Sequence, residues 1–331
     1  MAADGRSESE RVGRARAGDH GAFRALVEPY QRELHGHCYR MTGSHDDADD
    51  LVQETLFRAW RGLGTYVSRG SFRGWLYRIA TNTTLNLIDS APRRREMINS
   101  AGEPPWLQPY PPTEGDRDPA DFVEQLETVG LAFVVAFQNL PGRQRSALLL
   151  CDVLGFSPAE AAEILDCSVP AANSVLQRAR STMATVLPVA SPAPSEEQRR
   201  YVDRFVDAWR AADTDALLGL LQDTVHLTMP PHALEWFGSA GVLDVLMEIA
   251  PDRDPSLLRF LGTRANGEQG FATYVRVPGT DSFARHCVMF FGSATVAVGK
   301  ITGFTEDRVF DILNLPMTVD ISSSGGDGAP A

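Results

Sequence analysis

Hydrophobic positions recur at helical spacing through the first half of the chain. After Asp46 the apolar side chains come in adjacent pairs about every four residues, as on one face of an amphipathic helix. Ser44 or an aspartate is expected to cap this helix. The acidic residues in its first turn also suit the helix dipole. A second amphipathic helix is predicted over residues 71–90 and ends before Pro92. The apolar positions of the first helix are Leu51, Val52, Thr55, Leu56, Ala59 and Trp60.

Residues 143–183 have the pattern of a helix-turn-helix. Ser157 is a predicted N-cap, with Pro158 at the first helical position and Glu160 three residues after the cap. The first helix should end near Leu165, and after the tight turn "DCS" a second should run from about Pro170 to Met183. Such a pair can present its second helix to the major groove of DNA.

The last third of the chain has a different pattern. Two helices, over 196–213 and 214–223, precede segments rich in β-branched and aromatic residues, which predict strands. Helices followed by strands indicate an α+β domain. The segments expected as strands are 224–231, 271–277, 283–292, 294–306 and 308–316.

Prolines separate these parts. Residues 99–120 contain six prolines and residues 188–195 read "PVASPAPS", so neither segment can form a continuous helix. The fold class is therefore multidomain, with two all-α domains followed by an α+β domain. The predicted divisions are 8–97, an acidic linker 98–124, the helix-turn-helix domain 125–187, a linker 188–195, the α+β domain 196–320 and a disordered tail 321–331.

The net charge of −12 at first argues against a nucleic-acid-binding protein. Its distribution weakens that objection, because residues 188–331 carry −8 of it and residues 69–95 hold six arginines against one acid. No apolar run is long enough to span a membrane, and no signal peptide is recognisable, so we expect a cytoplasmic protein with no membrane contact.

Metal and cofactor sites are not predicted. The four cysteines form no CxxC pair, which indicates neither a zinc site nor a disulfide framework. Cys38 lies near His35 and His37, which leaves a redox or metal role open, although a buried thiol is favoured. The aspartates at 46, 47, 49 and 50 lack the alternating ligands, glycine and distant glutamate of a calcium loop.

Three of these segments together resemble a known family. "DDADDLVQETLFRAW", "FRGWLYRIATNTTLNLIDSAPRRR" and "LPGRQRSALLLCDVLGFSPAEAAEILDCSVPAANSVLQRAR" are similar to regions 2.2, 2.3 to 2.4, and 4.1 to 4.2 of bacterial RNA polymerase sigma factors of the extracytoplasmic-function class. The α+β part resembles the cone-shaped SnoaL-like family. The resemblance implies a protein that binds core RNA polymerase, recognises two promoter hexamers and helps open the duplex.

Site residues follow from the resemblance. Binding to the clamp helices of the largest polymerase subunit is implied for Asp49, Asp50, Gln53, Glu54 and Arg58. Contact with minus-ten DNA is implied for Tyr66, Phe72, Arg73, Arg78, Asn82, Thr83, Asn86, Arg93, Arg94 and Arg95. Trp75, by contrast, is expected in the core. Contact with minus-thirty-five DNA is implied for Ser168, Ala171, Asn173, Ser174, Gln177, Arg178 and Arg180.

Two positions depart from the family pattern. Relatives usually carry basic residues where this chain has Asn173 and Val175, so weak or polymerase-assisted binding at minus thirty-five is expected, although asparagine can still pair with adenine. In the linker, "WLQPYP" at 106–111 places aromatic side chains beside prolines. We expect this segment to dock on a surface.

The α+β domain has two candidate uses. A regulator would set the activity of the promoter-binding domains, with a small ligand as a candidate switch, and its fusion to them supplies a high effective concentration. The alternative is a bifunctional protein whose third domain is an enzyme acting on a small apolar substrate. Because no constellation has diagnostic spacing, no catalytic residue is assigned and regulation is favoured. Candidates to line a ligand pocket are His226, His232, Trp236 and Phe290.

Overall fold

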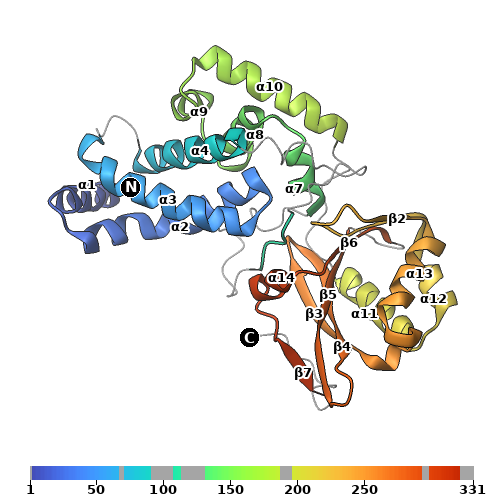
Figure 1. Ribbon diagram of the computed structural model, residues 1–331. Coiled ribbons are helices and arrows are strands. Elements are labelled where there is room, and N and C mark those ends of the chain that lie inside the picture. The colour runs from blue at the N-terminus through green and yellow to red at the C-terminus, as the bar shows by residue number, and fades with distance from the viewer. Residues whose placement is uncertain are drawn as a thin grey trace. The chain divides into compact units, whose positions relative to one another are not determined.

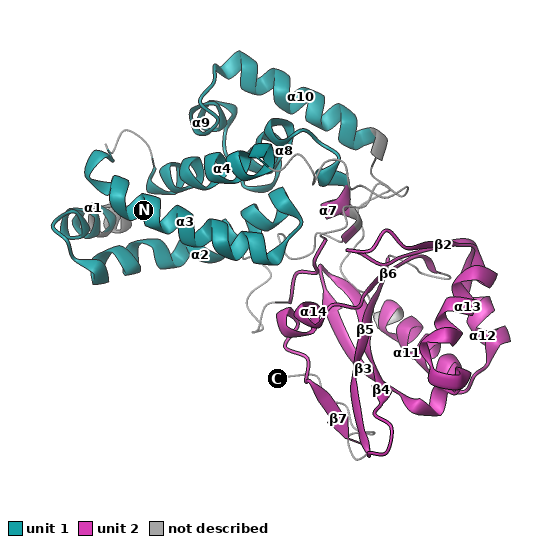
Figure 2. Cartoon of the chain, in the orientation of Figure 1, with its two compact units in different colours: residues 1–97, 136–187 teal, residues 98–135, 188–331 magenta. Residues whose placement is uncertain are grey.

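Figure 1 shows the computed structural model, which describes residues 2–66, 71–90, 107–112, 131–186, 196–292 and 298–320. The chain divides into two compact units, residues 1–97 with 136–187 and residues 98–135 with 188–331 (Figure 2). Of the predicted linker 98–124, only 107–112 are described. The predicted linker 188–195 and tail 321–331 lie outside the described residues. No helix in the described ranges is long and apolar enough to cross a membrane.

The first unit consists of helices, as the sequence predicts. Helix α4 packs on α2 and α3 and also on α8 and α9, so it joins these two pairs of helices. The helices are α1 (Ala2–Arg16), α2 (His20–Thr42), α3 (His45–Gly62), a 3₁₀ turn (Leu63–Thr65), α4 (Phe72–Ser90), α7 (Leu131–Gln138), which enters from the second unit, α8 (Gly142–Leu148), a π-helical turn (Leu149–Val153), α9 (Pro158–Ile164) and α10 (Val169–Val186).

The turn between α2 and α3 is fixed by two adjacent residues. Gly43 ends α2 with φ 77°, a left-handed conformation that glycine adopts without strain. Ser44 then begins α3, and its hydroxyl accepts a hydrogen bond from the Asp47 amide at 3.1 Å. The predicted cap is therefore the serine. This short connection holds the end of α2 close to the first turns of α3.

The helix-turn-helix prediction is confirmed in α9 and α10. Ser157 accepts from the Glu160 amide and the Glu160 carboxylate accepts from the Ser157 amide at 2.8 Å, which is a complete capping box. Asp166 turns the chain with φ 50°. On α10, Ala172, Leu176, Ala179 and Met183 are buried at spacings of three and four, so the opposite face is presented to solvent.

The second unit is the predicted α+β domain. Its described strands form one sheet in the order β2-β1-β6-β5-β4-β3, with β7 paired to β5. The β1–β6 pair is parallel and the other pairs are antiparallel. The elements are α11 (Glu196–Arg210), α12 (Thr214–Leu220), β1 (Leu221–Thr228), β2 (Glu235–Phe237), α13 (Ser239–Ile249), two 3₁₀ turns (Pro251–Arg253 and Pro255–Leu257), β3 (Leu258–Ala265), β4 (Glu268–Arg276), β5 (Ser282–Phe291), β6 (Val298–Phe304), α14 (Asp307–Ile312) and β7 (Thr318–Asp320).

The main core of this unit lies between one face of the sheet and helices α11, α12 and α13 (Figure 1). Phe205 and Trp209 of α11 contact Phe271 of β4, at ring-centroid distances of 6.3 and 5.9 Å. Alternate strand residues point away from these helices. On that opposite face, Phe290 packs on Phe304 at 6.1 Å.

One predicted strand is wrong. Residues 308–316 were expected to be extended because they are rich in apolar and β-branched residues, yet α14 occupies Asp307–Ile312. Val309, Phe310, Ile312 and Leu313 are buried. Their spacing of i, i+1, i+3 and i+4 is the helical period, so the pattern of positions was a better guide than residue type.

Candidate nucleic-acid interface

The acidic helix α3 has one buried face and one open face. Ala48, Leu51, Thr55 and Ala59 are buried, while Asp50 and Gln53 are exposed. Phe57 is 55% exposed on the same helix, with the Arg61 guanidinium 5.5 Å from its ring centroid. The open face therefore combines acids with an exposed aromatic ring, which is a combination suited to a protein partner.

Three members of the predicted polymerase-binding set have partners within the unit. Glu54 accepts from Arg58 one turn later at 2.6 Å, and Arg58 also reaches the Thr83 hydroxyl of α4 at 3.3 Å. Asp49 lies beside His35 of α2, with 3.3 Å between Nε2 and Oδ1. The sequence identified Asp49 and Arg58 as surface residues but could not show these partners.

The aromatic side chains around the start of α4 pack against one another. Tyr66 and Phe72 are buried, and their rings lie 5.6 Å apart in an edge-to-face arrangement. Trp75, which was expected in the core, is partly buried at the edge of this cluster, 5.0 Å from Tyr66. In this structure Trp75 is the more accessible ring, and stacking of a base on Tyr66 or Phe72 would first require these rings to be exposed.

Arg73 of α4 is held by the helix-turn-helix part of the same unit. Its guanidinium donates to the carbonyl of Leu154 at 3.3 Å and lies 4.6 Å from the ring of Phe156. Glu33 of α2 accepts from the Arg73 Nε at 3.1 Å and from the Tyr77 hydroxyl at 3.2 Å. The guanidinium therefore joins the α2–α4 helices to the segment before α9.

Other predicted minus-ten residues are more accessible. Arg78 is exposed and lies 3.5 Å from Asp166 in the turn between α9 and α10. Asn82 is partly exposed and Asn86 is exposed, whereas Thr83 is buried and donates to the Ile79 carbonyl. Arg93, Arg94 and Arg95 lie outside the described residues.

Helix α10 presents the whole predicted minus-thirty-five set to solvent. Within that set, Arg180 forms a double contact with Asp152, at 2.9 Å from Nε and 2.5 Å from Nη2. This ion pair raises the pKa of Arg180 further and holds its guanidinium toward the π-helical turn Leu149–Val153. The exposed residues are Ser168, Ala171, Asn173, Ser174, Gln177, Arg178 and Arg180.

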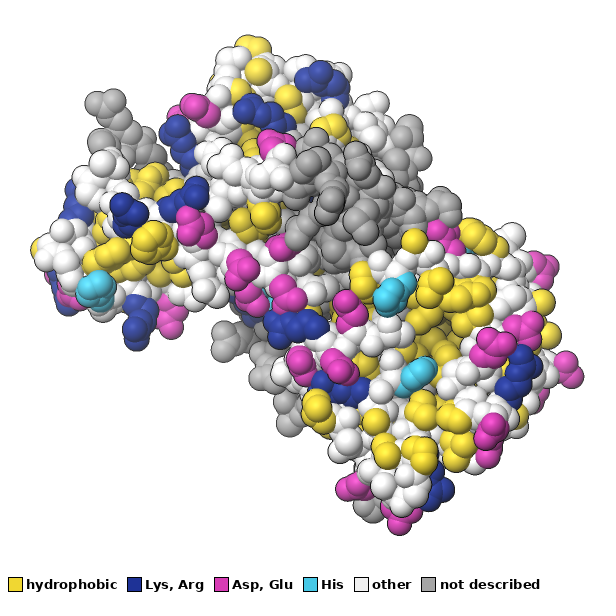
Figure 3. Space-filling view, in the orientation of Figure 1, with side chains coloured by type: hydrophobic (Ala, Val, Ile, Leu, Met, Phe, Trp, Pro, Cys, Tyr) yellow, Lys and Arg dark blue, Asp and Glu magenta, His cyan; other side chains and the backbone are white. Residues whose placement is uncertain are grey.

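Charged side chains on the described surface are mixed. On the face shown in Figure 3, arginines on the helical unit lie among acidic side chains and polar residues. This arrangement agrees with the carboxylate partners of Arg58, Arg73 and Arg180, which are Glu54, Glu33 and Asp152. A nucleic acid would therefore have to compete with internal carboxylates for several of these cations.

The linker segment 107–112 lies on the second unit. The Tyr110 amide donates to Oδ1 of Asn266 at 2.7 Å, and the Asn266 amide donates to the Tyr110 carbonyl at 3.0 Å. Leu107 is 1% exposed. Further along, the Leu131 amide at the start of α7 donates to Oε1 of Glu268 at 2.9 Å. The β3–β4 hairpin thus binds the linker at Tyr110 and the start of α7 at Leu131.

The candidate ligand residues are divided between the two faces of the sheet. Trp236 packs on the helix-covered core, as does Leu227, its partner on β1. His226, next along β1, faces the other way, where its ring stacks on Phe237 at 4.2 Å and Nε2 lies 3.2 Å from Glu235. Phe290 also faces away from the helices, and His232 lies in the loop after β1. No cavity on a single face could be lined by all four.

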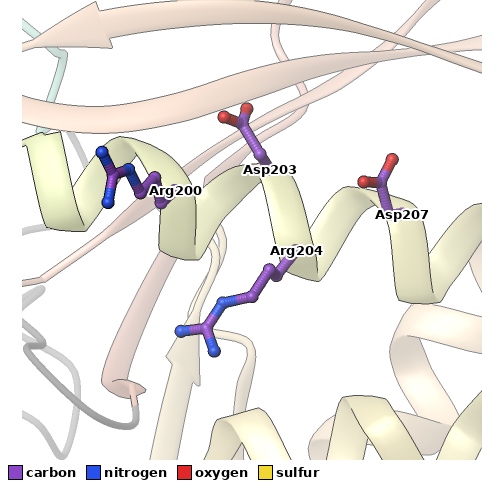
Figure 4. A pocket seen from close by; sticks show the side chains of 4 residues that line it. All are labelled: Arg200, Asp203, Arg204 and Asp207. Carbon is purple, nitrogen blue, oxygen red and sulfur yellow. The ribbon is translucent and has the colours of Figure 1, made fainter.

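A surface hollow of the second unit lies along α11. It is lined by Arg200, Asp203, Arg204 and Asp207, which are exposed charged residues on the outer face of the helix (Figure 4). None of them belongs to the apolar core that packs beneath α11. The hollow is therefore distinct from the positions that the sequence proposed for a ligand.

The chain matches known proteins along most of its length. Residues 26–94 match the family Sigma-70 region 2, and residues 131–183 match Sigma-70, region 4. An ECF RNA polymerase sigma factor of Mycobacterium tuberculosis, SigG, is 38% identical over 316 residues, which cover 89% of this chain and 84% of the relative. The chain belongs to the ECF RNA polymerase sigma factors. It is therefore a promoter-specific initiation factor of transcription.

A second relative of this ECF sigma factor extends the match to the fold. SigJ of Mycobacterium tuberculosis is 29% identical over 83% of this chain and 88% of the relative. The crystal structure of SigJ matches 88% of this chain and 99% of its own with a TM-score of 0.64, at 22% sequence identity. The two proteins share the order of helical domains and a C-terminal α+β domain.

Sequence reasoning missed several features of this sigma factor. It did not find the Glu33–Arg73 pair, the binding of the linker by Asn266, or the approach of His35 to His45 and Asp49. A partial signal existed for Asn266, since "NG" between two apolar runs is typical of a tight hairpin turn. The other features join segments that are distant in sequence, and no local pattern reports them.

Proposed function

We propose that this sigma factor initiates transcription at specific promoters under restraint by its own C-terminal unit, which holds the linker between regions 2 and 4. The observation that carries the proposal is the pair of hydrogen bonds between Tyr110 and Asn266, at 2.7 and 3.0 Å. The burial of Leu107 and the Glu268–Leu131 bond add to the same attachment.

The restraint has a geometric reason. Regions 2 and 4 contact each other in the first unit through Arg73 and Arg78, and buried Arg145 of α8 also donates to the Met41 carbonyl of α2. Promoter elements centred near −10 and −35 lie about 25 base pairs apart, or roughly 85 Å along B-DNA. Reading both elements therefore requires the regions to separate, and a linker fixed to the second unit opposes that separation.

The open face of α3 is the proposed site for core RNA polymerase, through the clamp helices of its largest subunit. Support comes from the exposure of Asp50, Gln53 and Phe57 on one helix whose other face is fully packed. An exposed phenylalanine surrounded by polar groups is typical of an interface centre. Phe57 was absent from the sequence-derived set and is added here.

For promoter DNA, the exposed face of α10 is the proposed minus-thirty-five reader, and the Asn82 and Asn86 positions of α4 are the proposed minus-ten contacts. The support is the uniform exposure of that face of α10, with Ala172 and Leu176 buried behind it. Arg73 would join the minus-ten contacts only after it leaves Leu154 and Phe156.

The decisive experiment is promoter-dependent transcription with core polymerase and the full chain carrying Asn266→Gly. Glycine tolerates the positive φ of this position, 52°, and removes the side-chain acceptor of the Tyr110 amide. Asn314→Gly is the matched control, because Asn314 also has φ 52° and is exposed after α14. We expect higher transcription from N266G and wild-type transcription from N314G.

Equal transcription by N266G, N314G and the wild type would contradict restraint through the linker. A chain lacking residues 196–331 gives a second comparison. If that truncated chain is no more active than the full chain, the C-terminal unit does not inhibit initiation. If the full chain directs no more promoter-specific transcription than core polymerase alone, initiation by this chain is itself contradicted.

A further inference from the structure

Two histidines and a carboxylate meet where α2 approaches the first turns of α3. His35 comes from α2, and His45 and Asp49 lie one turn apart on α3. The distances are 3.3 Å from His35 Nε2 to Asp49 Oδ1 and 3.5 Å from His45 Nδ1 to Asp49 Oδ2. One donor atom from each residue lies within 4.8 Å of the other two.

These separations suit coordination to one ion. Two donor atoms bound at about 2.0–2.1 Å to a tetrahedral zinc ion lie roughly 3.3 Å apart. The observed distances of 3.3 and 3.5 Å are close to this separation, and His35 and Asp49 are also joined by a side-chain hydrogen bond that orients both groups.

The surroundings hold the donors in place before any ion arrives. Ser44 caps α3 immediately before His45, and Gly43 ends α2, so the two helices present their side chains at a fixed turn. The side chains of His35 and His45 are only 15% and 17% exposed, whereas that of Asp49 is 47% exposed. An ion would thus be held from the protein side and accessible to water at Asp49.

The neighbouring thiol is not part of this cluster. Cys38 lies one turn beyond His35, but it is fully buried and accepts from the Thr84 hydroxyl at 3.6 Å. His37 faces Thr81 at 3.0 Å. The sequence left a metal role open for Cys38 with His35 and His37. Of these three residues, only His35 belongs to the cluster with His45 and Asp49.

We propose that His35, His45 and Asp49 form a binding site for a divalent transition-metal ion such as zinc, with water or a partner's donor in the fourth position. Two imidazoles and one carboxylate favour borderline ions over magnesium or calcium, which prefer oxygen ligands. An ion here would neutralise Asp49 and join α2 to α3 at the edge of the open α3 face.

The test uses the full chain, freed of metal by a chelator and titrated with Co²⁺ as a spectroscopic substitute for Zn²⁺. We expect one Co²⁺ per chain, visible absorption of a tetrahedral ion without a thiolate charge-transfer band, and displacement by Zn²⁺. His45→Gln should weaken Co²⁺ binding by about 100-fold or more. Removing a ligand should reduce metal affinity at least as much as removing a group that is hydrogen-bonded to a ligand.

His226→Gln is the matched control, because His226 forms another buried histidine–carboxylate pair, with Glu235, in the described part of the second unit. H226Q should bind Co²⁺ like the wild type. Asp49→Ala provides a variant at a half-exposed position, which keeps the test valid if H45Q does not fold. A wild-type chain that shows no tetrahedral Co²⁺ spectrum, or D49A binding equal to the wild type, would overturn the site.

Discussion

Individual residues of this sigma factor show how strongly burial controls their chemistry. Burial raises the pKa of Cys38 to about 12 and that of Cys287 to about 12, although each lies near a threonine hydroxyl. Cys151 and Cys167 are only partly buried. Because the thiolate is the reactive form, the four cysteines fall into two protected and two accessible groups.

We therefore expect a thiol-specific reagent at neutral pH to label the native chain at Cys151 and Cys167 alone. Cys38 and Cys287 should react only after unfolding. Mass spectrometry of digested, labelled protein measures the modified positions, and Cys167→Ser should remove one label as a control. Rapid native labelling of Cys38 would show that the core around α2 and α4 is not packed as described.

Two buried cysteines and two buried tyrosines make the stability of the fold depend on pH. In the folded chain, burial raises the pKa values of Cys38 and Cys287 from 9.0 to about 12, and of Tyr201 and Tyr274 from 10.0 to about 12. At pH values between the unfolded and the folded pKa of each group, the unfolded chain releases protons that the folded chain keeps. Stability is therefore lost as pH rises. Urea unfolding at about pH 8 and about pH 10.5 should give a smaller unfolding free energy at the higher pH. An unchanged value would contradict the burial of these groups.

At the scale of elements, the period of the apolar pattern identified several of the helices. Ser157 with Glu160, and the spacing of Leu51, Thr55 and Ala59, define helices that the structure contains. The residue types of the α14 segment predict a strand, whereas the spacing of its buried positions is helical, as the structure shows. Placement of the candidate site residues was less predictable. Burial of Tyr66 and Phe72 depends on contacts such as that of Phe72 with Tyr30, which lies 42 residues before it in the chain.

Helix α10 has no cation before Arg178, Asn173 in that first half is exposed, and Arg180 is held by Asp152. Asn173→Arg should strengthen binding to minus-thirty-five duplexes and steepen the dependence of log K on log salt by about one, since one more phosphate contact releases more counterion. Fluorescence anisotropy over a salt series measures both. Met317→Arg adds the same charge at an exposed position of the second unit and should change neither.

If N173R and M317R alter affinity and salt dependence equally, the effect is one of net charge and α10 is not the DNA-binding helix. If N173R changes neither quantity, the exposed face of α10 does not approach phosphate.

At the scale of the whole molecule, the linker segment 107–112 is bound to the β3–β4 hairpin within the second unit. The Tyr110 amide is bound by the Asn266 side chain, so it should exchange slowly with solvent deuterium in the full chain. N266G should increase exchange in the peptide that contains residues 107–112. N314G should leave it at the wild-type rate. Equally fast exchange in all three chains would show that the linker is not held in solution.

The sequence by itself determined the local elements and the family. Helical period, caps and proline breaks act over a few residues, so they can be read along the chain, and they placed the two helical domains ahead of an α+β domain. Only the tertiary structure decided which of those residues meet. Arg73 with Glu33, Asn266 with Tyr110, and the approach of His35 to His45 and Asp49 depend on how the helices and hairpins pack. Packing joins residues that are far apart in the chain, and the spacing of residues in a sequence carries no record of such contacts.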